Sequence, residues 1–545
     1  MDRAMSSTGT ETTASNILRH RPADLQPQLP HGRSDHGGHA SDGSSIPSGN
    51  KSPKPALSKK YRHIAAIHCA SQPSTLSHDA AATPSFLGFR NLGLIVLIAG
   101  NLRLLIENIQ KYGVLICVRC HDFRKQDLQV GLILYTLVPC CLLIAYLIEL
   151  FAGFEARTQR LRLYNKRFGN DTRGEKDDQA SDAPARDGRT SPTEDEQARF
   201  RMTWYIIAAL HACNISIGLV ITSWAVYYYV NHPLIGTMVE MHAIIVWLKT
   251  ASYALTNRDL RHAHLHPQTG ELESIPELYK TCPYPENVTF GNLCYFWWAP
   301  TLIYQPVYPR TDKIRWVFVA KRLLEVVGLC VVMWLLSAQY AAPTLQNSLR
   351  AWREWDVAAM VERVLKLSTI SLVIWLAGFF ALFQSFLNAL AEVTRFADRS
   401  FYDDWWNSDS LGTYWRTWNK PVSNYFRRHV FSPLMGRGYS FHFAASVVFS
   451  LSALLHELAV GIPTHNVIGV AFIGMLIQLP LIGFTKRFEK ANSPTRKMIG
   501  NCIFWVTFTT FGQPFAALCY FYAWQIKFGS ISEKWNSSQA QFVSA

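Results

Sequence analysis

Long apolar runs recur along this chain and limit what it can fold into. A run of about 20 apolar residues is long enough to cross the hydrocarbon core of a bilayer as a helix. Of the 545 residues 49% are hydrophobic and only 17% are charged, and most of the charges lie outside these runs. We therefore predict an all-α polytopic membrane protein with about nine transmembrane helices, near residues 90–110, 129–152, 203–229, 234–255, 316–340, 365–391, 441–463, 466–485 and 499–525.

Polar stretches divide the chain around this membrane domain. Residues 1–85 are rich in Ser, Pro, His and Gly and lack apolar periodicity, so we expect a disordered cytosolic tail. The membrane domain is expected to span 86–526 and to be followed by a short lumenal tail, 527–545. Two polar segments inside the domain are expected in the cytosol: 155–201, with a disordered insertion, and the aromatic-rich 392–440.

The net charge of +14 could suggest nucleic acid as a partner. In a membrane protein, a bias of Lys and Arg toward cytosolic loops explains such a charge better, so no nucleic-acid partner is expected. Basic residues follow the second run at Arg157, Arg160 and Arg162 and the eighth run at Lys486 and Arg487. This pattern predicts a cytosolic N-terminus, and nine spans then leave the C-terminus in the lumen.

The eleven cysteines show no repeated metal-ligand spacing. Cys117, Cys120 and His121 match the form to which c-type haem attaches, but the pattern stands alone in a short loop. A free thiol pair or a local disulfide is the favoured interpretation. His456-Glu457 does not begin an HExxH zinc motif, because Val460 occupies the position of the second histidine. We expect no metal and no cofactor.

The run 441–463 carries His456 and Glu457 near its end. Ionisable residues are costly in a membrane helix, so they usually face a protein interior or a water-filled cavity. Ser452 lies one turn before His456 on the same helix face. Two interpretations stay open from these residues alone: a histidine that only hydrogen-bonds a neighbouring helix, and a functional base.

The polar segment upstream is unusually rich in large aromatic side chains. Water-exposed loops rarely carry so many, so these residues are expected to line a pocket or to anchor an amphipathic helix at the membrane surface. Three basic residues close by, Lys420, Arg427 and Arg428, could bind a phosphate-bearing substrate or simply follow the cytosolic charge bias. The tryptophans and amides of interest are Trp405, Trp406, Asn407, Trp415, Trp418 and Asn419.

Three sequence features together resemble one enzyme family. FYDDWWN spans Phe401 to Asn407, WNKPV spans Trp418 to Val422, and the intramembrane His456 follows. This combination is similar to that of the membrane-bound O-acyltransferase family, in the branch that esterifies neutral lipids. Residues 101–116 and 284–315 resemble the first span and the large cytosolic loop of the same branch. The resemblance covers residues 90 to 525 except for the 170–198 insertion.

The resemblance implies a bundle of membrane helices around an intramembrane reaction chamber. It implies transfer of an acyl chain from acyl-CoA to the free hydroxyl of 1,2-diacylglycerol, which yields triacylglycerol. It also implies an endoplasmic reticulum membrane location and a homodimer or homotetramer. Sterol and fatty-alcohol acceptors remain alternatives. A proton-coupled transporter, with His456 as a proton relay, is the alternative from another class.

The resemblance also suggests roles for individual residues. His456 matches the catalytic base, and Asn419 matches an amide near the reaction centre. Two positions depart from the family pattern: Ser423 stands where members often carry His, and Arg416 where they carry Gln. The residues expected to contact substrates are Trp405, Trp406, Asn407, Trp415, Trp418, Ser452, Glu457, Gln478 and Gln513.

The same chemistry follows from the residues themselves. An alcohol is a poor nucleophile at neutral pH, so a base must remove its proton as it attacks a thioester. Burial in a membrane favours a neutral imidazole, which is the form that can accept a proton. An amide such as that of Asn419 can stabilise the negative charge that develops on the thioester oxygen. No GxSxG elbow is present to supply a covalent nucleophile.

Overall fold

The computed structural model describes residues 124–168, 194–265, 275–489 and 493–529, together with 102, 106–111 and 113. In this part of the chain every named element is a helix. Seven helices within the described residues are long and apolar enough to cross a membrane. The predicted polytopic helical class is therefore confirmed. The seven lie at 125–162, 201–229, 233–265, 357–393, 441–461, 470–489 and 495–527.

Two of the nine predicted spans are not among these seven. The first, 90–110, falls largely outside the described residues, as do Cys117 and Cys120. The fifth forms helix α8 (Trp316–Leu336), which carries three charges near its start. There Arg322 pairs with Glu325 at 2.7 Å, and the hydroxyl of Ser385 donates to the same carboxylate. These contacts lower the cost of placing the charges in an apolar helix.

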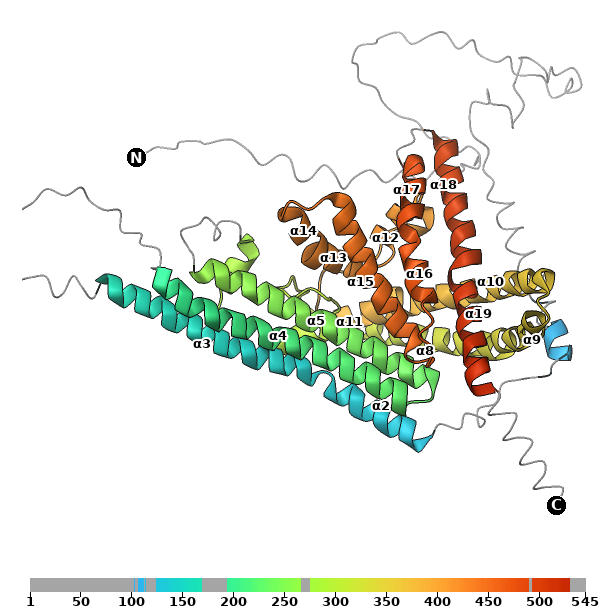
Figure 1. The fold of residues 1–545 in the computed structure, drawn as a ribbon, viewed down its shortest axis with the longest axis horizontal. Helices are drawn as coiled ribbons and strands as arrows, with labels where there is room; N and C mark the ends of the chain where they lie inside the picture. The colour runs from blue at the N-terminus through green and yellow to red at the C-terminus, as the bar shows by residue number, and fades with distance from the viewer. Residues whose placement is uncertain are drawn as a thin grey trace, which may run out of the picture. The chain divides into compact units, whose positions relative to one another are not determined.

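Four helices in the first half of the chain pack side by side (Figure 1). Pro139 lacks an amide hydrogen, which explains why the second apolar run, 129–152, divides into two helices at this point. Helices α3 and α4 also extend further into the polar 155–201 segment than we expected. The four are α2 (Lys125–Leu137), α3 (Cys140–Phe168), α4 (Glu194–Tyr229) and α5 (Pro233–Leu265).

In the second half of the chain, α15 (Phe441–Gly461) packs against α16 (Val470–Leu476) and against α5. Helix α10 (Val357–Phe379) continues through the π-helical η4 (Phe380–Phe386) into α11 (Leu387–Val393) and packs against α8. After α16 the chain continues through α17 (Gln478–Glu489), α18 (Pro494–Val506), the π-helical η7 (Thr507–Gly512) and α19 (Gln513–Trp524).

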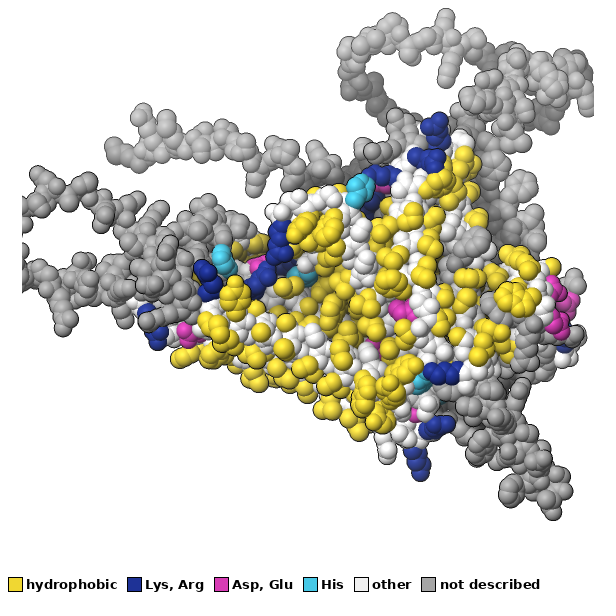
Figure 2. Space-filling model, in the orientation of Figure 1, with side chains coloured by type: hydrophobic (Ala, Val, Ile, Leu, Met, Phe, Trp, Pro, Cys, Tyr) yellow, Lys and Arg dark blue, Asp and Glu magenta, His cyan; other side chains and the backbone are white. Residues whose placement is uncertain are grey.

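Large apolar side chains face outward along these helices. Phe154 is 69% exposed and Leu324 is 74% exposed. Figure 2 shows hydrophobic side chains spread over the visible face of α2–α5. A soluble protein rarely exposes so much contiguous apolar surface, whereas lipid-facing helices require it.

Several short helices connect α11 to α15 and pack against the longer helices. They are η5 (Trp405–Asn407), α12 (Leu411–Thr417), α13 (Lys420–Phe426), the π-helical η6 (Arg427–Phe431) and α14 (Ser432–Gly436). This is the aromatic-rich segment of the sequence. Its packing against α10, α15 and α17 positions most of the candidate site residues.

Candidate active site

The backbone of its own helix sets the tautomer of His456. Its Nδ1 lies 2.8 Å from the carbonyl oxygen of Ser452, one turn earlier in α15. A carbonyl only accepts hydrogen bonds, so Nδ1 must carry the proton and donate it. In a neutral imidazole the lone pair then belongs to Nε2. No described residue donates a hydrogen bond to Nε2, so this nitrogen is free to accept a proton.

One face of α15 presents the histidine together with Phe449 and Ser452, because these residues are spaced three and four apart. His456 is exposed at the surface of the described residues, and Ser452 beside it is half-buried. The imidazole is therefore accessible to a substrate. The Ser452 hydroxyl lies 3.5 Å from Nδ1.

Trp415 connects this face of α15 to two neighbouring elements. Its ring contacts that of Phe449, with centroids 6.0 Å apart. Its Nε1 donates to Oε1 of Gln478 at 3.3 Å. The structure thus brings together two residues that the sequence singled out, Trp415 on α12 and Gln478 on α17, and places Trp415 against Phe449 of the helix that carries His456.

Asn419 caps the N-terminus of α13 with the oxygen of its side-chain amide. Its Oδ1 accepts a hydrogen bond from the backbone N–H of Val422 at 3.2 Å, which makes Asn419 the N-cap. This bond assigns the amide oxygen to the helix and leaves Nδ2 as a donor without an acceptor among the described residues. Trp418, just before it, stacks on Tyr414 with centroids 5.8 Å apart.

Glu457 faces a different environment from its neighbour His456. Its carboxylate accepts from the backbone N–H of Gly469 at 2.8 Å and of Phe472 at 3.1 Å, and from the hydroxyl of Tyr520 at 2.7 Å. These three donors tie α15 to the start of α16 and to α19. In this structure Glu457 therefore positions the histidine helix, and its carboxylate is already occupied by protein donors.

The FYDDWWN segment forms a packing centre. Trp405 is 2% exposed and contacts aromatic rings of α10, α12 and α18. The carbonyl of Trp406 accepts from the side chains of Asn501 and Trp505. Asn407 is exposed, and its amide donates to Asp404. A side chain as buried as Trp405 has almost no surface to offer a substrate, so its place in the structure gives it a packing role.

The sequence also singled out Gln513 and Arg416. Gln513 begins α19, and its side chain makes no hydrogen bond to the described residues. Arg416, one of the departures from the family pattern, lies at the end of α12 and pairs with Glu489 of α17 at 2.8 Å. Both partners are substantially exposed.

Sequence reasoning missed two residues of the site. Phe449 could have been found from its spacing of three and seven residues before Ser452 and His456. Tyr520 had no such signal, because it meets Glu457 only through the packing of α19.

Comparison with known proteins identifies the family. The profile of the membrane-bound O-acyltransferase family matches residues 200–522, more than half of the chain. The chain belongs to this family. The match includes α12, α13, α15 and α17, so this O-acyltransferase has its candidate site within the shared region. Membership also settles its class as an acyltransferase enzyme.

Curated relatives of this O-acyltransferase extend over most of its length. Diacylglycerol O-acyltransferase 1A of Glycine max is 34% identical over 85% of this chain and 83% of the relative. Diacylglycerol O-acyltransferase 1-2 of Oryza sativa subsp. japonica is 34% identical over 85% of this chain and 86% of the relative. Diacylglycerol O-acyltransferase 1 of Arabidopsis thaliana is 32% identical over 87% of this chain and 80% of the relative.

Proposed function

We propose that this protein transfers an acyl chain from acyl-CoA to the free hydroxyl of 1,2-diacylglycerol, with His456 as the general base. The observation that carries the proposal is the hydrogen bond from Nδ1 of His456 to the Ser452 carbonyl. This bond leaves Nε2 as the only basic nitrogen of the neutral ring, and no described residue donates a hydrogen bond to it.

The reaction proceeds without a covalent enzyme intermediate in this scheme. Nε2 of His456 takes the hydroxyl proton as the acceptor oxygen bonds to the thioester carbonyl carbon. The carbon–sulfur bond then breaks, and the CoA sulfur leaves and takes a proton from the imidazolium. The products are triacylglycerol and CoA, and the histidine returns to its starting state. General-base assistance of this kind contributes about 10²–10⁴ in rate.

Asn419 supplies the donor that stabilises the thioester oxygen. Negative charge grows on the thioester oxygen as the acceptor attacks, and a fixed donor stabilises it. Nδ2 of Asn419 fits this role because capping α13 holds the amide in place while its N–H bonds stay unused. Trp415 and Gln478, hydrogen-bonded to each other, form a wall on which an acyl chain could lie.

The substrates are proposed from the relatives. The similar proteins of soybean, rice and Arabidopsis are named diacylglycerol O-acyltransferase 1. Both diacylglycerol and the acyl chain partition into lipid, which fits a base placed on a membrane helix. We extend the proposal to an endoplasmic reticulum membrane location, with the basic loop ends in the cytosol.

The test is acyl transfer in microsomes from a strain that lacks its own neutral-lipid acyltransferases. Labelled oleoyl-CoA is supplied with diacylglycerol, a sterol or a fatty alcohol in parallel. We expect labelled triacylglycerol from the wild type and a loss of about 10²–10⁴-fold in His456→Ala at equal protein level. Trp355→Ala, an exposed change on the loop between α9 (Ala342–Arg353) and α10, is the control and keeps its activity.

Each other outcome has a defined meaning. Ester formation with sterol or fatty alcohol alone would replace the acceptor and keep the mechanism. Full activity in His456→Ala would remove this residue from the chemistry.

A further inference from the structure

The first residues of FYDDWWN are bonded to the turn that carries Asn419. The backbone N–H of Lys420 donates to the carbonyl of Phe401 at 3.0 Å. The backbone N–H of Asp403 donates to the carbonyl of Thr417 at 2.9 Å. We call this pair of bonds the clamp. Because one bond lies on each side of Asn419 along the chain, the clamp fixes the backbone from which the amide projects.

Tyr402 is the one residue between the two bonds on the FYDDWWN side, and Trp418 and Asn419 lie opposite it. Two residues against one is the arrangement of a β-bulge, which is often found next to active sites, where it re-aims a side chain. A salt bridge of 3.0 Å also joins Lys420 to Asp403 across the clamp. The backbone therefore couples the place of Tyr402 to the direction of the Asn419 side chain.

The side chain of Tyr402 anchors the clamp to a membrane helix. Its hydroxyl donates to Oε1 of Gln384 at 2.6 Å. Partial burial raises the pKa of Tyr402 above its usual value, so the hydroxyl stays protonated and remains the donor. Gln384 lies in the π-helical η4, and wide turns of this kind are frequent at functional sites.

Apolar contacts hold the ring of Tyr402 independently of its hydroxyl. The buried ring of Phe383 lies with its centroid 6.5 Å from that of Tyr402 and 6.0 Å from that of Trp418. Phe379 contacts Tyr402 as well, with centroids 5.0 Å apart. Removal of the hydroxyl alone therefore leaves the ring packed and breaks only the bond to Gln384.

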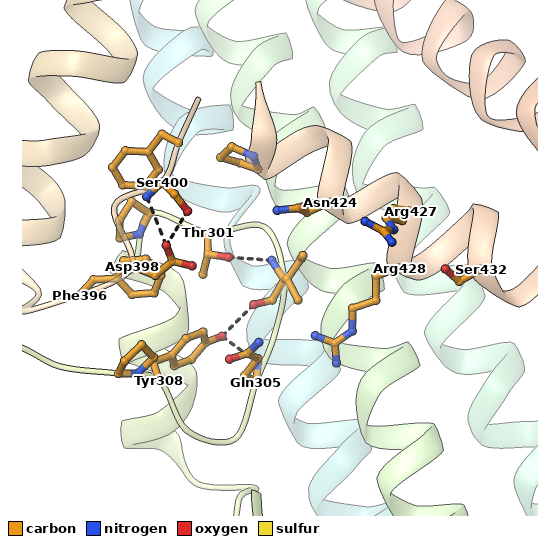
Figure 3. Close-up of a pocket in the computed structure, with 15 residues that line it drawn as sticks. Thr301, Gln305, Tyr308, Phe396, Asp398, Ser400, Asn424, Arg427, Arg428 and Ser432 are labelled. Carbon is orange, nitrogen blue, oxygen red and sulfur yellow. Dashed lines mark hydrogen bonds between the residues drawn. The ribbon is translucent and has the colours of Figure 1, made fainter. Parts of the chain in front are cut away.

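The clamp also borders a cavity of about 460 Å³ (Figure 3). Phe401, on one side of the clamp, and Pro421, which follows Lys420 on the other, belong to the lining of this cavity. Its volume is within the range typical of small-molecule sites. The clamp thus lies next to a space that a substrate can enter.

We propose that Tyr402, through its hydrogen bond to Gln384, is a positioning residue that directs the Asn419 amide toward the thioester oxygen. This inference rests on the proposed role of Asn419 as the donor to that oxygen. Tyr402 acts through the clamp and takes no part in bond making or breaking. A small misplacement of a fixed donor lowers the rate of the chemical step and leaves substrate binding almost unchanged.

The test is a double-mutant cycle on the full-length protein in lipid nanodiscs. Labelled oleoyl-CoA is supplied with the acceptor on which the wild type acts. Tyr402→Phe removes the hydroxyl and keeps the ring, and Gln384→Met removes the acceptor and keeps the volume. Each is measured alone and combined with Asn419→Ser. Tyr284→Phe, which removes another buried hydroxyl bond, of 2.9 Å to Glu149, is the matched control.

We expect Tyr402→Phe and Gln384→Met each to lower kcat about ten-fold, with the KM for each substrate within about two-fold of the wild type. In the Asn419→Ser background, the same changes should alter kcat by less than about two-fold, because the donor that they direct is already gone. Tyr284→Phe should change kcat by one and the same factor in both backgrounds.

Three results would overturn the positioning role and leave the proposed donor intact. They are wild-type kcat in Tyr402→Phe, a rise in KM without a fall in kcat, and an equal loss of kcat with and without the Asn419 amide. Wild-type kcat in Asn419→Ser would instead remove the proposed donor, and the positioning role would fall with it.

Discussion

Two polar side chains of the candidate site each make a bond that determines which of their atoms remain free. The Ser452 carbonyl binds Nδ1 of His456, and the Val422 N–H binds Oδ1 of Asn419. His456 is left with the lone pair of Nε2, and Asn419 is left with the donor group Nδ2–H. A base and an oxyanion donor are the two groups that attack of an alcohol on a thioester requires.

Asn419 caps α13 with its Oδ1 and is proposed to donate from its Nδ2, and substitutions can separate these two roles. Asn419→Ser keeps an N-cap oxygen for α13 but loses the amide donor. We expect kcat to fall about 10²–10³-fold while the thermal midpoint stays near that of the wild type. Asn419→Ala loses the cap as well and is expected to cost about 1 kcal/mol of stability in addition.

Acyl transfer kinetics and thermal unfolding of the purified variants check this prediction. Wild-type turnover in Asn419→Ser would show that Nδ2 plays no part in the reaction and that the residue acts only as a cap.

At the scale of elements, buried polar contacts hold the helices of the first half together. Glu149 of α3 is buried and accepts from Arg261 of α5 and from the hydroxyl of Tyr284, and it lies 3.3 Å from Nε2 of His211 on α4. Three helices and the following loop therefore meet at one carboxylate. A buried charge in such a network is costly to leave unpaired.

Replacing this carboxylate tests that dependence. Glu149→Gln keeps the shape of the side chain and leaves the Arg261 guanidinium without its counter-charge. We expect a loss of about 3–5 kcal/mol, seen as a lower thermal midpoint in detergent or nanodiscs. Glu362→Gln breaks the exposed pair with Lys366 and should change stability by less than about 1 kcal/mol. Similar midpoints for the two variants would contradict a special role for the buried network.

At the scale of the whole molecule, the exposed apolar surface and the seven membrane-compatible helices agree with the family assignment. The distribution of charge predicts an orientation of the chain in the bilayer. Basic side chains gather at the Arg427–Arg428 turn and at the end of α17, where Lys486 and Arg487 lie. From the bias of Lys and Arg toward the cytosol we predict that these ends of the helices face that side.

A glycosylation reporter tests this orientation. We expect an acceptor sequon appended after Ala545 to be modified and one placed before Met1 to remain unmodified, because the nine predicted spans would put the C-terminus in the lumen. A mobility shift that endoglycosidase removes is the measurement. Modification at both ends or at neither would mean an even number of spans.

Several features of this protein could be predicted from the sequence because their causes are local. The length of an apolar run decides whether it can span a bilayer, and seven of the nine predicted spans reappear as suitable helices. The four-residue spacing of Ser452 and His456 places them on one face wherever that helix packs. The FYDDWWN and WNKPV motifs pointed to the family that the comparison confirms.

Other features depend on contacts between segments far apart in the sequence, and only the tertiary structure decided them. Trp405 resembled a pocket residue until α10, α12 and α18 were seen to bury it. Glu457 appeared to accompany His456, yet α16 and α19 supply its donors. The cavity lined by Arg427 and Arg428 forms because the α13–η6 helix faces the loops 300–309 and 396–401. Local spacing shows which residues share a helix face, whereas packing decides what that face meets.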